Sequence, residues 1–362
     1  MKIIYCINGF YRPAGMERAL AEKTNWLAAH GYEILIATCE QKGREPAFLL
    51  DERIRRENLS IGYEDNNGGS FADKLIHYPA KKIRHKRALA ALLKREKADI
   101  VVSMFGNEAD FLPGIKDGSK KILEVHFSRF KRLQYGRKGL WALADGWRSR
   151  RDLNTVRKYD RFVVLTEEDK GYWGDLANIR VIPNPRTFTL TEPASLQSHT
   201  VLAVGRYTHQ KGFDLLLKAW AMIDTEGWTL RIAGSGDPME NLPANVITGL
   251  ATDIKEEYLN AAFLVMSSRY EGLPMVLLEA QAAGLPVVSF ACKCGPRDVI
   301  SDGVDGILVP EGDIKGLAKG MKKLMDDVQL RRKMGSAAFR NSNKYDKEQI
   351  MARWEKLFRE LS

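Results

Sequence analysis

Residues 269–286 have the sequence RYEGLPMVLLEAQAAGLP, in which a short apolar segment lies between a proline and a glycine. Pro274 suits the first turn of a helix and Gly284 its C-terminal end, so the stretch predicts a helix of roughly ten residues. Nearly every position in this segment is apolar, which predicts burial on all sides. LPVVSF (285–290) follows directly and has the composition of a buried strand. A buried helix leading into a buried strand is typical of parallel α/β sheets.

The same alternation of apolar runs and helical patterns continues in both directions along the chain. In the first half the predicted strands are KIIYCI (2–7), EILIATC (33–39), ADIVVSM (98–104), KKILEVHF (120–127) and DRFVVLT (160–166). In the second half they are TVLAVG (200–205), WTLRIAG (228–234), NVITGL (245–250), AAFLVMSS (261–268), LPVVSF (285–290) and GILVP (306–310). Strands that alternate with helices predict parallel sheets with helices on both faces. The predicted fold class is therefore α/β and doubly wound.

The length of the chain and one proline-rich segment predict two domains. With 362 residues the chain is longer than a usual single domain of about 150. Residues 180–200, RVIPNPRTFTLTEPASLQSHT, have the polar, proline-containing composition of a linker. We predict a first domain over 1–184 and a second over 185–345. The final segment, 346–362, has an apolar stripe at helical spacing and is predicted to be a helix that returns to the first domain.

Composition limits the class of protein. A hydrophobic fraction of 44% is too high for a disordered chain. The four cysteines form no dense disulfide framework, and the N-terminal residues MKIIYCINGF lack the pattern of a signal peptide. No run of about 18 apolar residues predicts a membrane span. We therefore expect a cytoplasmic protein.

The net charge of +10 is confined to the first half of the chain. Residues 1–185 contain 34 basic and 24 acidic residues, whereas residues 186–362 contain 22 of each. The basic residues concentrate in KKIRHKR (81–87) and in residues 128–151, where Phe130, Trp141 and Trp147 lie among them. A solvated face, attraction to anionic lipid or a lipid-linked acceptor, and binding of nucleic acid all remain open. No nucleic-acid recognition motif supports the third, so we expect no nucleic acid partner.

VGRYTHQKG (204–212) places Arg206 and Lys211 between a predicted strand and a predicted helix. Such loops, at the carboxyl ends of parallel strands, are where doubly wound sheets bind ligands. A guanidinium and an ammonium together suit a diphosphate. The same two residues are also common in ordinary surface loops, so this loop does not decide the function by itself.

Glu271 and Glu279 lie eight positions apart in the opening stretch, the first in a loop and the second within the apolar helix. A buried carboxylate needs hydrogen-bond donors, and a ribose diol could supply two of them. The alternative is that Glu279 is structural and holds backbone amides. The backbone amides of Met275, Val276 and Leu277 at the start of the helix are predicted to lie where a phosphate could bind.

These motifs, together with IAGSGDP (232–238) and GPRDVISDGVDGILVP (295–310), closely resemble the C-terminal domain of family 4 retaining glycosyltransferases. The resemblance covers about residues 200–330. It implies the GT-B fold, in which two Rossmann-like domains face an inter-domain cleft. It also implies that Arg206 and Lys211 hold the donor diphosphate, that Glu271 contacts the transferred sugar and that Glu279 holds the ribose.

The resemblance implies further nucleotide contacts in the second domain. Gly234, Ser235 and Gly236 would lie near the nucleotide, and the amides of Met275, Val276 and Leu277 would bind the phosphates.

The first half of the chain resembles the same family more thinly. NGFYRPAGMERAL (8–20) is similar to the glycine-rich first loop of the family, with Gly15 and Met16 at the start of the following helix. The family usually has two adjacent glycines there, whereas this chain has Ala14-Gly15. EVHFSR (124–129) places His126 where the family has a histidine that reaches the donor sugar.

The resemblance implies a retaining glycosyltransferase that moves a hexose-type sugar from a nucleotide-diphosphate donor, with UDP as the expected nucleotide, to an acceptor hydroxyl. Glu271, His126, Arg206 and Lys211 would be its catalytic residues. The acceptor would be a glycan or lipid-linked glycan of a surface polysaccharide, with peripheral contact to an anionic membrane. No cofactor and no metal are expected, since the chain has no D-x-D triplet and Cys292-x-Cys294 has no matching pair. An epimerase or phosphorylase of the same fold, and a non-catalytic nucleotide-sugar-binding or polyanion-binding protein, are the alternatives.

Overall fold

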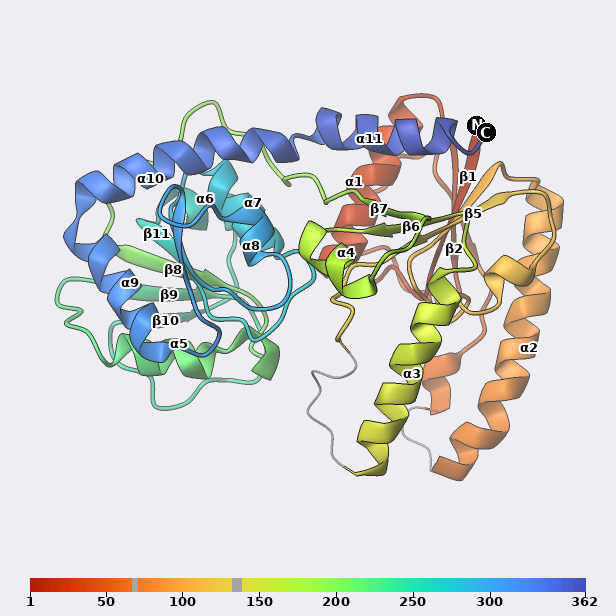
Figure 1. The fold of residues 1–362 in the computed structure, drawn as a ribbon, viewed down its shortest axis with the longest axis horizontal. Helices are drawn as coiled ribbons and strands as arrows, with labels where there is room; N and C mark the ends of the chain where they lie inside the picture. The colour runs from red at the N-terminus through yellow and green to blue at the C-terminus, as the bar shows by residue number, and fades with distance from the viewer. Residues whose placement is uncertain (67–70, 132–138) are drawn as a thin grey trace. The chain divides into compact units, whose positions relative to one another are not determined.

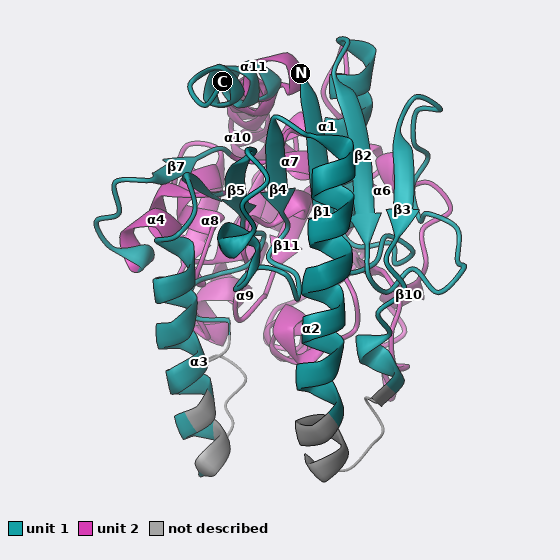
Figure 2. Cartoon of the chain, turned by 90° about the vertical axis from the view of Figure 1, so that its right-hand side faces the viewer, with its two compact units in different colours: residues 1–164, 173–182, 351–362 teal, residues 165–172, 183–350 magenta. Residues whose placement is uncertain are grey.

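The computed structural model describes residues 1–66, 71–131 and 139–362, which form two compact units (Figures 1 and 2). Unit 1 comprises Met1–Val164, Trp173–Ile182 and Met351–Ser362, and unit 2 comprises Leu165–Tyr172 and Pro183–Ile350. The predicted first domain was one continuous segment, 1–184, and this is wrong for Leu165–Tyr172. Leu165 is buried in the core of unit 2, so its segment belongs there.

Unit 1 contains a seven-stranded parallel sheet with the order β3-β2-β1-β4-β5-β6-β7. Its strands are β1 (Lys2–Ile7), β2 (Glu33–Thr38), β3 (Arg55–Asn58), β4 (Ile100–Ser103), β5 (Lys120–Glu124), β6 (Arg161–Val164) and β7 (Ile179–Val181). The five strands predicted in this half are all present. Two strands were not predicted: β3, whose residues RREN are polar, and β7, which overlaps the start of the predicted linker.

Helices cover both faces of this sheet. They are α1 (Gly15–Ala29), α2 (Phe71–Glu96), α3 (Leu140–Val156), the final residue of α4 (Glu167–Trp173) and most of α11 (Lys347–Arg359). Ile4 and Cys6 of β1 pack in one core with Leu89 and Leu93 of α2. Tyr5, which lies between them in β1, points to the other face, beside Lys23 of α1. This alternation follows from the period of two along a strand.

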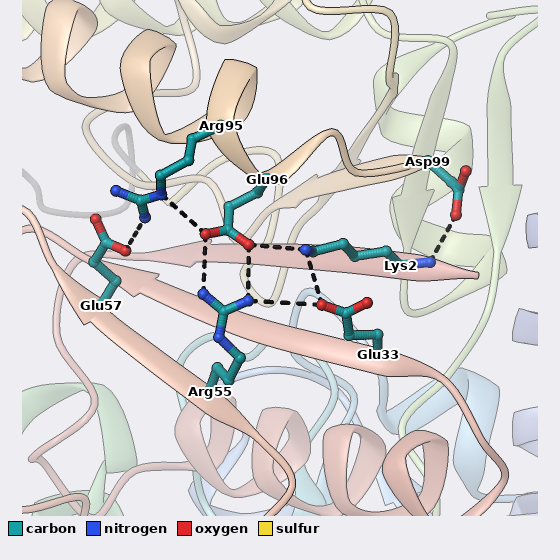
Figure 3. Close-up of polar contacts among 7 residues, drawn as sticks. All are labelled: Lys2, Glu33, Arg55, Glu57, Arg95, Glu96 and Asp99. Carbon is teal, nitrogen blue, oxygen red and sulfur yellow. Dashed lines mark hydrogen bonds and ion pairs between the residues drawn. The ribbon is translucent and has the colours of Figure 1, made fainter.

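Ion pairs hold the strand starts of unit 1, at the edge opposite the carboxyl ends (Figure 3). The buried carboxylate of Glu96, at the end of α2, accepts from Arg55 of β3 at 2.8 and 2.9 Å. It also pairs with Lys2 of β1 at 2.8 Å and with Arg95 at 3.1 Å. Hydrogen bonds from Arg55 and Lys2 lower the pKa of Glu96 to about 2. The polar strand β3 is therefore held by its pairing with β2 and by these ion pairs.

Unit 2 contains a six-stranded parallel sheet with the order β10-β9-β8-β11-β12-β13. The strands are β8 (Thr200–Val204), β9 (Thr229–Ala233), β10 (Val246–Gly249), β11 (Phe263–Met266), β12 (Val287–Phe290) and β13 (Gly306–Val309). The helices are α5 (Phe213–Trp220), α6 (Ile254–Leu259), α7 (Met275–Ala282), α8 (Pro296–Val299), α9 (Ile314–Asp326) and α10 (Val328–Asn341). All six predicted strands of this half are present.

The sheet of unit 2 has a core on each face. Val201 and Ala203 of β8 pack with α5 and α9, whereas Leu202 between them packs with Leu277 of α7 on the other face. The predicted α/β fold with two Rossmann-like, doubly wound sheets is therefore confirmed.

Within the described residues, no helix combines the length and the apolar character that a membrane span requires.

Candidate functional site

The two motifs singled out in the second half of the chain are joined in unit 2. The loop after β8 and the loop after β11 lie at the carboxyl ends of neighbouring strands, because β8 and β11 are paired. The amide of Arg269 donates to the carbonyl of Gln210 at 2.8 Å, and Gln210 Nε2 donates to the carbonyl of Tyr270 at 2.9 Å. Ser267 Oγ donates to the carbonyl of Lys211 at 3.0 Å. The two loops therefore form one surface.

Lys211 and Glu271 form an ion pair on this surface, with Nζ and Oε1 2.7 Å apart. Their side chains are 18% and 8% exposed, so the pair is largely screened from bulk water but still reachable. The backbone of Glu271 is held on both sides, since its amide donates to Lys293 and its carbonyl accepts from Cys294. The cation and the first carboxylate of the predicted site thus lie together.

Gly212 makes the approach of the two loops possible. Its φ of +65° is in the left-handed region, and a Cβ there would lie 2.1 Å from the carbonyl oxygen of Ser267. The residue also ends the 3₁₀ turn His209–Lys211 and precedes α5.

Arg206 lies in the same loop and is exposed. Among the residues that the structure describes, no hydrogen bond or ion pair is found for its guanidinium. The loop after β9 lies beside it, because the amide of Tyr207 donates to the carbonyl of Ser235 at 2.8 Å. Gly234 allows this contact, since a Cβ there would lie 1.9 Å from the carbonyl oxygen of Gly205. Ser235 and Gly236 are exposed next to these residues, so the predicted nucleotide loop borders the predicted phosphate loop.

Glu279 is buried on α7 and accepts hydrogen bonds from two hydroxyl groups. Thr187 Oγ1 donates to Oε1 at 3.0 Å, and Tyr258 Oη donates to Oε2 at 2.7 Å. Neither donor was predicted from the sequence, because they come from positions 92 and 21 residues away. Both hydroxyl donors therefore fix the orientation of the Glu279 carboxylate within unit 2.

The start of α7 differs in one respect from the prediction. The helix begins at Met275, as expected, with Pro274 at its N-cap. The amide of Leu277, however, donates to the carbonyl of Pro274 at 3.0 Å, so it is not free for a phosphate. Phosphate contacts by the amides of Met275 and Val276 remain a prediction.

Gly15 and Met16 lie in unit 1, at the start of α1. Ala14 is the N-cap residue, with an extended φ of −128°. Because that conformation is open to any residue, the chain forms this helix start without the second glycine that the family usually has.

His126 follows β5 in unit 1 and forms the end of a buried chain of charges. Glu124 Oε1 lies 2.9 Å from His126 Nε2, and the same carboxylate pairs with Lys23 Nζ at 2.5 and 2.6 Å. Burial favours the neutral acid, but Lys23 and His126 outweigh it and lower the pKa of Glu124 to about 2. Since the carboxylate is ionised, His126 donates to it from Nε2.

The partners of His126 were not predicted from the sequence. Glu124 stands two positions before the histidine, and alternate strand residues share a face, so the period of two could have found it. Lys23 comes from α1, and its pairing depends on tertiary packing that no local pattern carries.

The cysteines are free thiols, and all four are buried. Burial raises the pKa of the Cys292 thiol well above its usual value. Over residues 1–66, 71–131 and 139–362, no three His, Cys, Asp or Glu side chains are grouped as they would be around a metal ion.

Two family models match the chain. The model described as Glycosyltransferase Family 4 matches residues 13–186, and the model described as Glycosyl transferases group 1 matches residues 198–327. The matched residues together cover most of the sequence and include every predicted site residue.

Curated relatives match over the whole length. The chain is 28% identical to an uncharacterized glycosyltransferase of Haemophilus influenzae, over 98% of this chain and 99% of the relative. It is 27% identical, over 100% of this chain and 99% of the relative, to a Campylobacter jejuni protein. That protein is named as an α-1,4-N-acetyl-D-galactosaminyltransferase acting on a diNAcBac-PP-undecaprenol-linked glycan.

Solved structures share the fold at low identity. Sucrose-phosphate synthase from Thermosynechococcus elongatus superposes with a TM-score of 0.82 at 18% identity, covering 99% of this chain and 98% of that one. Anabaena Alr3699/HepE, in a structure that contains UDP, superposes with a TM-score of 0.75 at 15% identity, covering 99% of this chain and 100% of that one.

Proposed function

This chain belongs to the family 4 glycosyltransferases and has the GT-B fold, and from that premise we propose that it is a retaining enzyme using a UDP-linked hexose-type donor and a glycan acceptor. The observation that carries the proposal is the ion pair between Lys211 and Glu271, held where two ligand-binding loops join. A bound diphosphate would draw Lys211 toward its own charge and release the Glu271 carboxylate to orient the sugar. The pair thus supplies both groups that the reaction needs, at one place.

In this reaction the bond between the sugar and the donor phosphate breaks while the acceptor oxygen attacks the same face of the sugar. Attack on the face from which the diphosphate departs retains the anomeric configuration, and the acceptor proton passes to an oxygen of the departing diphosphate. Arg206 and Lys211 would stabilise the negative charge that develops on the diphosphate. Glu271 would position the sugar and form no covalent bond to it.

UDP as the nucleotide is supported by the UDP in the Anabaena structure. The site around Glu279 supports a ribonucleotide of any base. Thr187 and Tyr258 hold this carboxylate in one orientation, in which it can accept from a ribose diol. A buried carboxylate held in this way suits a ribose more than a phosphate, because two negative charges would repel each other.

A thermal-shift series with UDP-, GDP-, ADP- and TDP-sugars tests the donor. We expect a UDP-sugar to raise the melting temperature, since a ligand that binds only the native state stabilises it. Lys211→Ala should lose most of this shift, while Lys322→Ala, on a remote and exposed ion pair of the same unit, should keep it. A shift with GDP- or ADP-sugars alone would exclude UDP.

The stereochemistry and the role of metal are tested in the transfer reaction itself. We expect the anomeric configuration of the donor sugar to be unchanged in the product by NMR. We also expect EDTA to leave the rate within about twofold, because Arg206 and Lys211 are proposed to meet the diphosphate charge. An inverted product, or a rate abolished by EDTA and restored by Mg²⁺, would contradict these two points separately.

The alternatives predict other products. An epimerase would isomerise the nucleotide-sugar with no acceptor present, and a phosphorylase would release a sugar phosphate. A non-catalytic binding protein would show the thermal shift without hydrolysis or transfer.

We further propose that unit 1 contacts an anionic membrane surface as a peripheral protein. Leu143 and Trp147 lie four positions apart on α3 and are 72% and 61% exposed, next to Arg148 and Arg150. Exposed apolar side chains among cations suit the interface of an anionic bilayer. The basic residues at 132–138, and the side chain of Trp141, lie outside the described part of the chain.

The basic stretch 81–87 contributes less to such a surface than its composition suggests. Arg84 donates to the carbonyls of Ser60 and Ile61, and Lys82 pairs with Asp110. These cations are engaged within unit 1, so α3 is the more exposed candidate.

A further inference from the structure

Three polar side chains in contact connect α1 to the carboxyl end of the sheet in unit 1. Both carboxylate oxygens of Glu124, the last residue of β5, accept from Lys23 Nζ, at 2.5 and 2.6 Å. His126 Nε2 lies 2.9 Å from Oε1 of the same carboxylate. The side chains of Lys23 and Glu124 are 2% and 1% exposed, whereas that of His126 is 6% exposed. Because parallel sheets bind ligands at this end, His126 is the member of the three that a ligand could reach.

Packing alone does not account for a lysine at position 23. An ammonium loses its hydration in the protein interior, and burial lowers the pKa of Lys23 although the pairing with Glu124 opposes the shift. Replacing a buried ion pair by well-packed apolar residues is often neutral for stability or even stabilising. The charge of Lys23 therefore calls for an explanation beyond the fold of unit 1.

Trp354 of α11 covers the ammonium of Lys23. The centroid of its ring lies 3.8 Å from Nζ, well within the distance of a cation–π interaction, and Trp354 is 1% exposed. The ammonium thus lies between a buried ring and a buried carboxylate. Its charge is held beside Glu124 and away from water.

The titratable side chains around the Glu124 carboxylate come from three elements: Lys23 from α1, Tyr5 from β1 and His126 from the end of β5. The Tyr5 ring lies 5.7 Å from Lys23 Nζ. Burial and the charge of Glu124 raise the pKa of Tyr5 well above its usual value, so its hydroxyl group is neutral. Lys23 and His126 are then the two groups that can supply positive charge to this carboxylate. Since Lys23 supplies a full charge, His126 has only to donate a hydrogen bond.

We propose that Lys23 and Glu124 are positioning residues for His126. Glu124 holds the imidazole through Nε2, and Lys23 supplies the charge that balances Glu124, so the ring is oriented without having to carry that charge itself. The inference rests on the proposed function and on the predicted role of His126 in it. Without Lys23, His126 would be the cation that remains beside the carboxylate.

Nitrogen-15 NMR of the histidine rings tests the charge arrangement without requiring a substrate. The chain has six histidines, so labelling with ¹⁵N-histidine gives few signals, and His126→Gln assigns the one of interest. Lys23→Met removes the charge and keeps most of the side-chain length. At the same pH, we expect a larger fraction of His126 rings with both nitrogens protonated in Lys23→Met than in the wild type. The reason is that an anion no longer offset by Lys23 favours the charged ring.

Glu124→Gln should change the His126 signal in the opposite direction. It removes the anion, so a smaller fraction of the rings should carry both protons. Opposite changes in the two variants identify an effect of charge, because a general loosening of unit 1 would not depend on the sign of the charge removed. Lys121→Met is the matched control: Lys121 is a buried lysine of the same strand that is paired with Asp117. It should leave the His126 signal unchanged and the transfer rate within about twofold.

The transfer reaction tests whether this arrangement serves the proposed function. We expect Lys23→Met to lower kcat by about tenfold or more, because a misoriented group no longer meets the reacting sugar. UDP binding should stay within about twofold, since the predicted diphosphate residues Arg206 and Lys211 lie in unit 2. If a single variant does not fold, the double variant Lys23→Met, Glu124→Gln leaves no uncompensated buried charge. It should lower kcat as well, and a smaller fraction of its His126 rings should carry both protons.

The possible results separate the proposal from the function on which it rests. The proposal is overturned if the His126 signal is unchanged in the folded variants, if both single variants change it in the same direction, or if kcat stays within about twofold of the wild type. If the signal changes as expected but the wild-type protein transfers no sugar from any nucleotide-sugar, the proposed function fails and the charge arrangement around His126 stands.

Discussion

The residues to which we assign the chemistry are charged side chains, each held by a polar partner of its own unit. Glu271 is held by Lys211, and Glu124 by Lys23 and His126. Such pairs fix the orientation of a side chain before a substrate arrives, which is how a site gains preorganised electrostatics. Their removal therefore tests function more sharply than it tests the fold.

Glu271→Gln keeps the shape of the side chain and removes its charge. We expect the transfer rate to fall by about 10²-fold or more, because the carboxylate orients the sugar as charge develops. Glu257→Gln is the matched control, since Glu257 also forms an ion pair in unit 2, with Arg231, but lies outside the joined loops. The measurement is transfer rate beside thermal melting, and equal rates for wild type and Glu271→Gln would rule out the assigned role.

The Glu124 carboxyl should make stability depend on pH. Its pKa is about 2 in the folded protein and 4.5 when exposed. A lowered pKa stabilises the fold above pH 4.5, and that contribution, about 3 kcal/mol at most, is lost as the pH falls from about 5 toward 2. Denaturant unfolding at a series of pH values across this window gives the free energy of unfolding at each pH. We expect this free energy to depend less steeply on pH in Glu124→Gln than in the wild type. We also expect it to be lower at neutral pH, because Lys23 is left unpaired. If the free energy of unfolding depended on pH equally steeply in both proteins, the ion pair between Glu124 and Lys23 would be contradicted.

At the scale of the elements, the apolar strands were predictable and the polar ones were not. β1, β8 and β12 have continuous apolar runs because helices cover both their faces. β3 (RREN) has none, since an edge strand can be held by charges such as those on Glu96. β7 has only three residues and lies in a proline-rich segment, so its hydrophobic pattern is too short to recognise.

The residues of the candidate site were also only partly predictable from the sequence. Arg206, Lys211, Glu271 and Glu279 could be found because they stand in local motifs at strand and helix ends. Thr187, Tyr258 and Lys23 could not, because each meets its carboxylate only after distant segments pack. The amide of Leu277 was predicted to be free, but the first turn of α7 closes on Pro274.

Substitution of Gly212, in the loop before α5, tests how closely this loop approaches Ser267. Gly212→Ala would place a left-handed Cβ 2.1 Å from the Ser267 carbonyl, so both strain and a clash result. Gly312 also has a positive φ, +78°, but an added Cβ there would have no atom within 4 Å. Gly312→Ala therefore measures the cost of the backbone strain without a clash. We expect about 1–2 kcal/mol of destabilisation for Gly312→Ala and clearly more for Gly212→Ala, together with weaker UDP binding. Equal losses of unfolding free energy would show that the loops are not in close contact.

At the scale of the whole molecule, the net positive charge is confined to the first half of the chain. The excess of +10 lies in residues 1–185, and residues 186–362 are neutral. The surface of α3 that contains Leu143 and Trp147 belongs to the basic half. The division separates the unit proposed to contact a membrane from the unit proposed to bind the donor.

Co-sedimentation with liposomes of phosphatidylglycerol tests the membrane contact. We expect salt-sensitive binding that falls by about tenfold or more in the double variant Leu143→Glu, Trp147→Glu, because apolar burial is lost and acidic charge is added. Leu49→Glu is the control, since Leu49 is 93% exposed in the same unit but lies away from α3. Binding that is insensitive to salt and to the double variant would exclude this surface.

The C-terminal segment Met351–Ser362 packs in unit 1, which affects the order in which the two units can be completed during synthesis. Trp354 and Phe358 are fully buried there, and the Trp354 ring lies 3.8 Å from the ammonium of Lys23. A ribosome makes Met351–Ser362 after every residue of unit 2. Unit 1 therefore begins first but has its complete sequence only after unit 2 does. Until Met351–Ser362 has been made, the part of unit 1 beside Lys23 that Trp354 later covers stays exposed, even though the rest of the unit is complete.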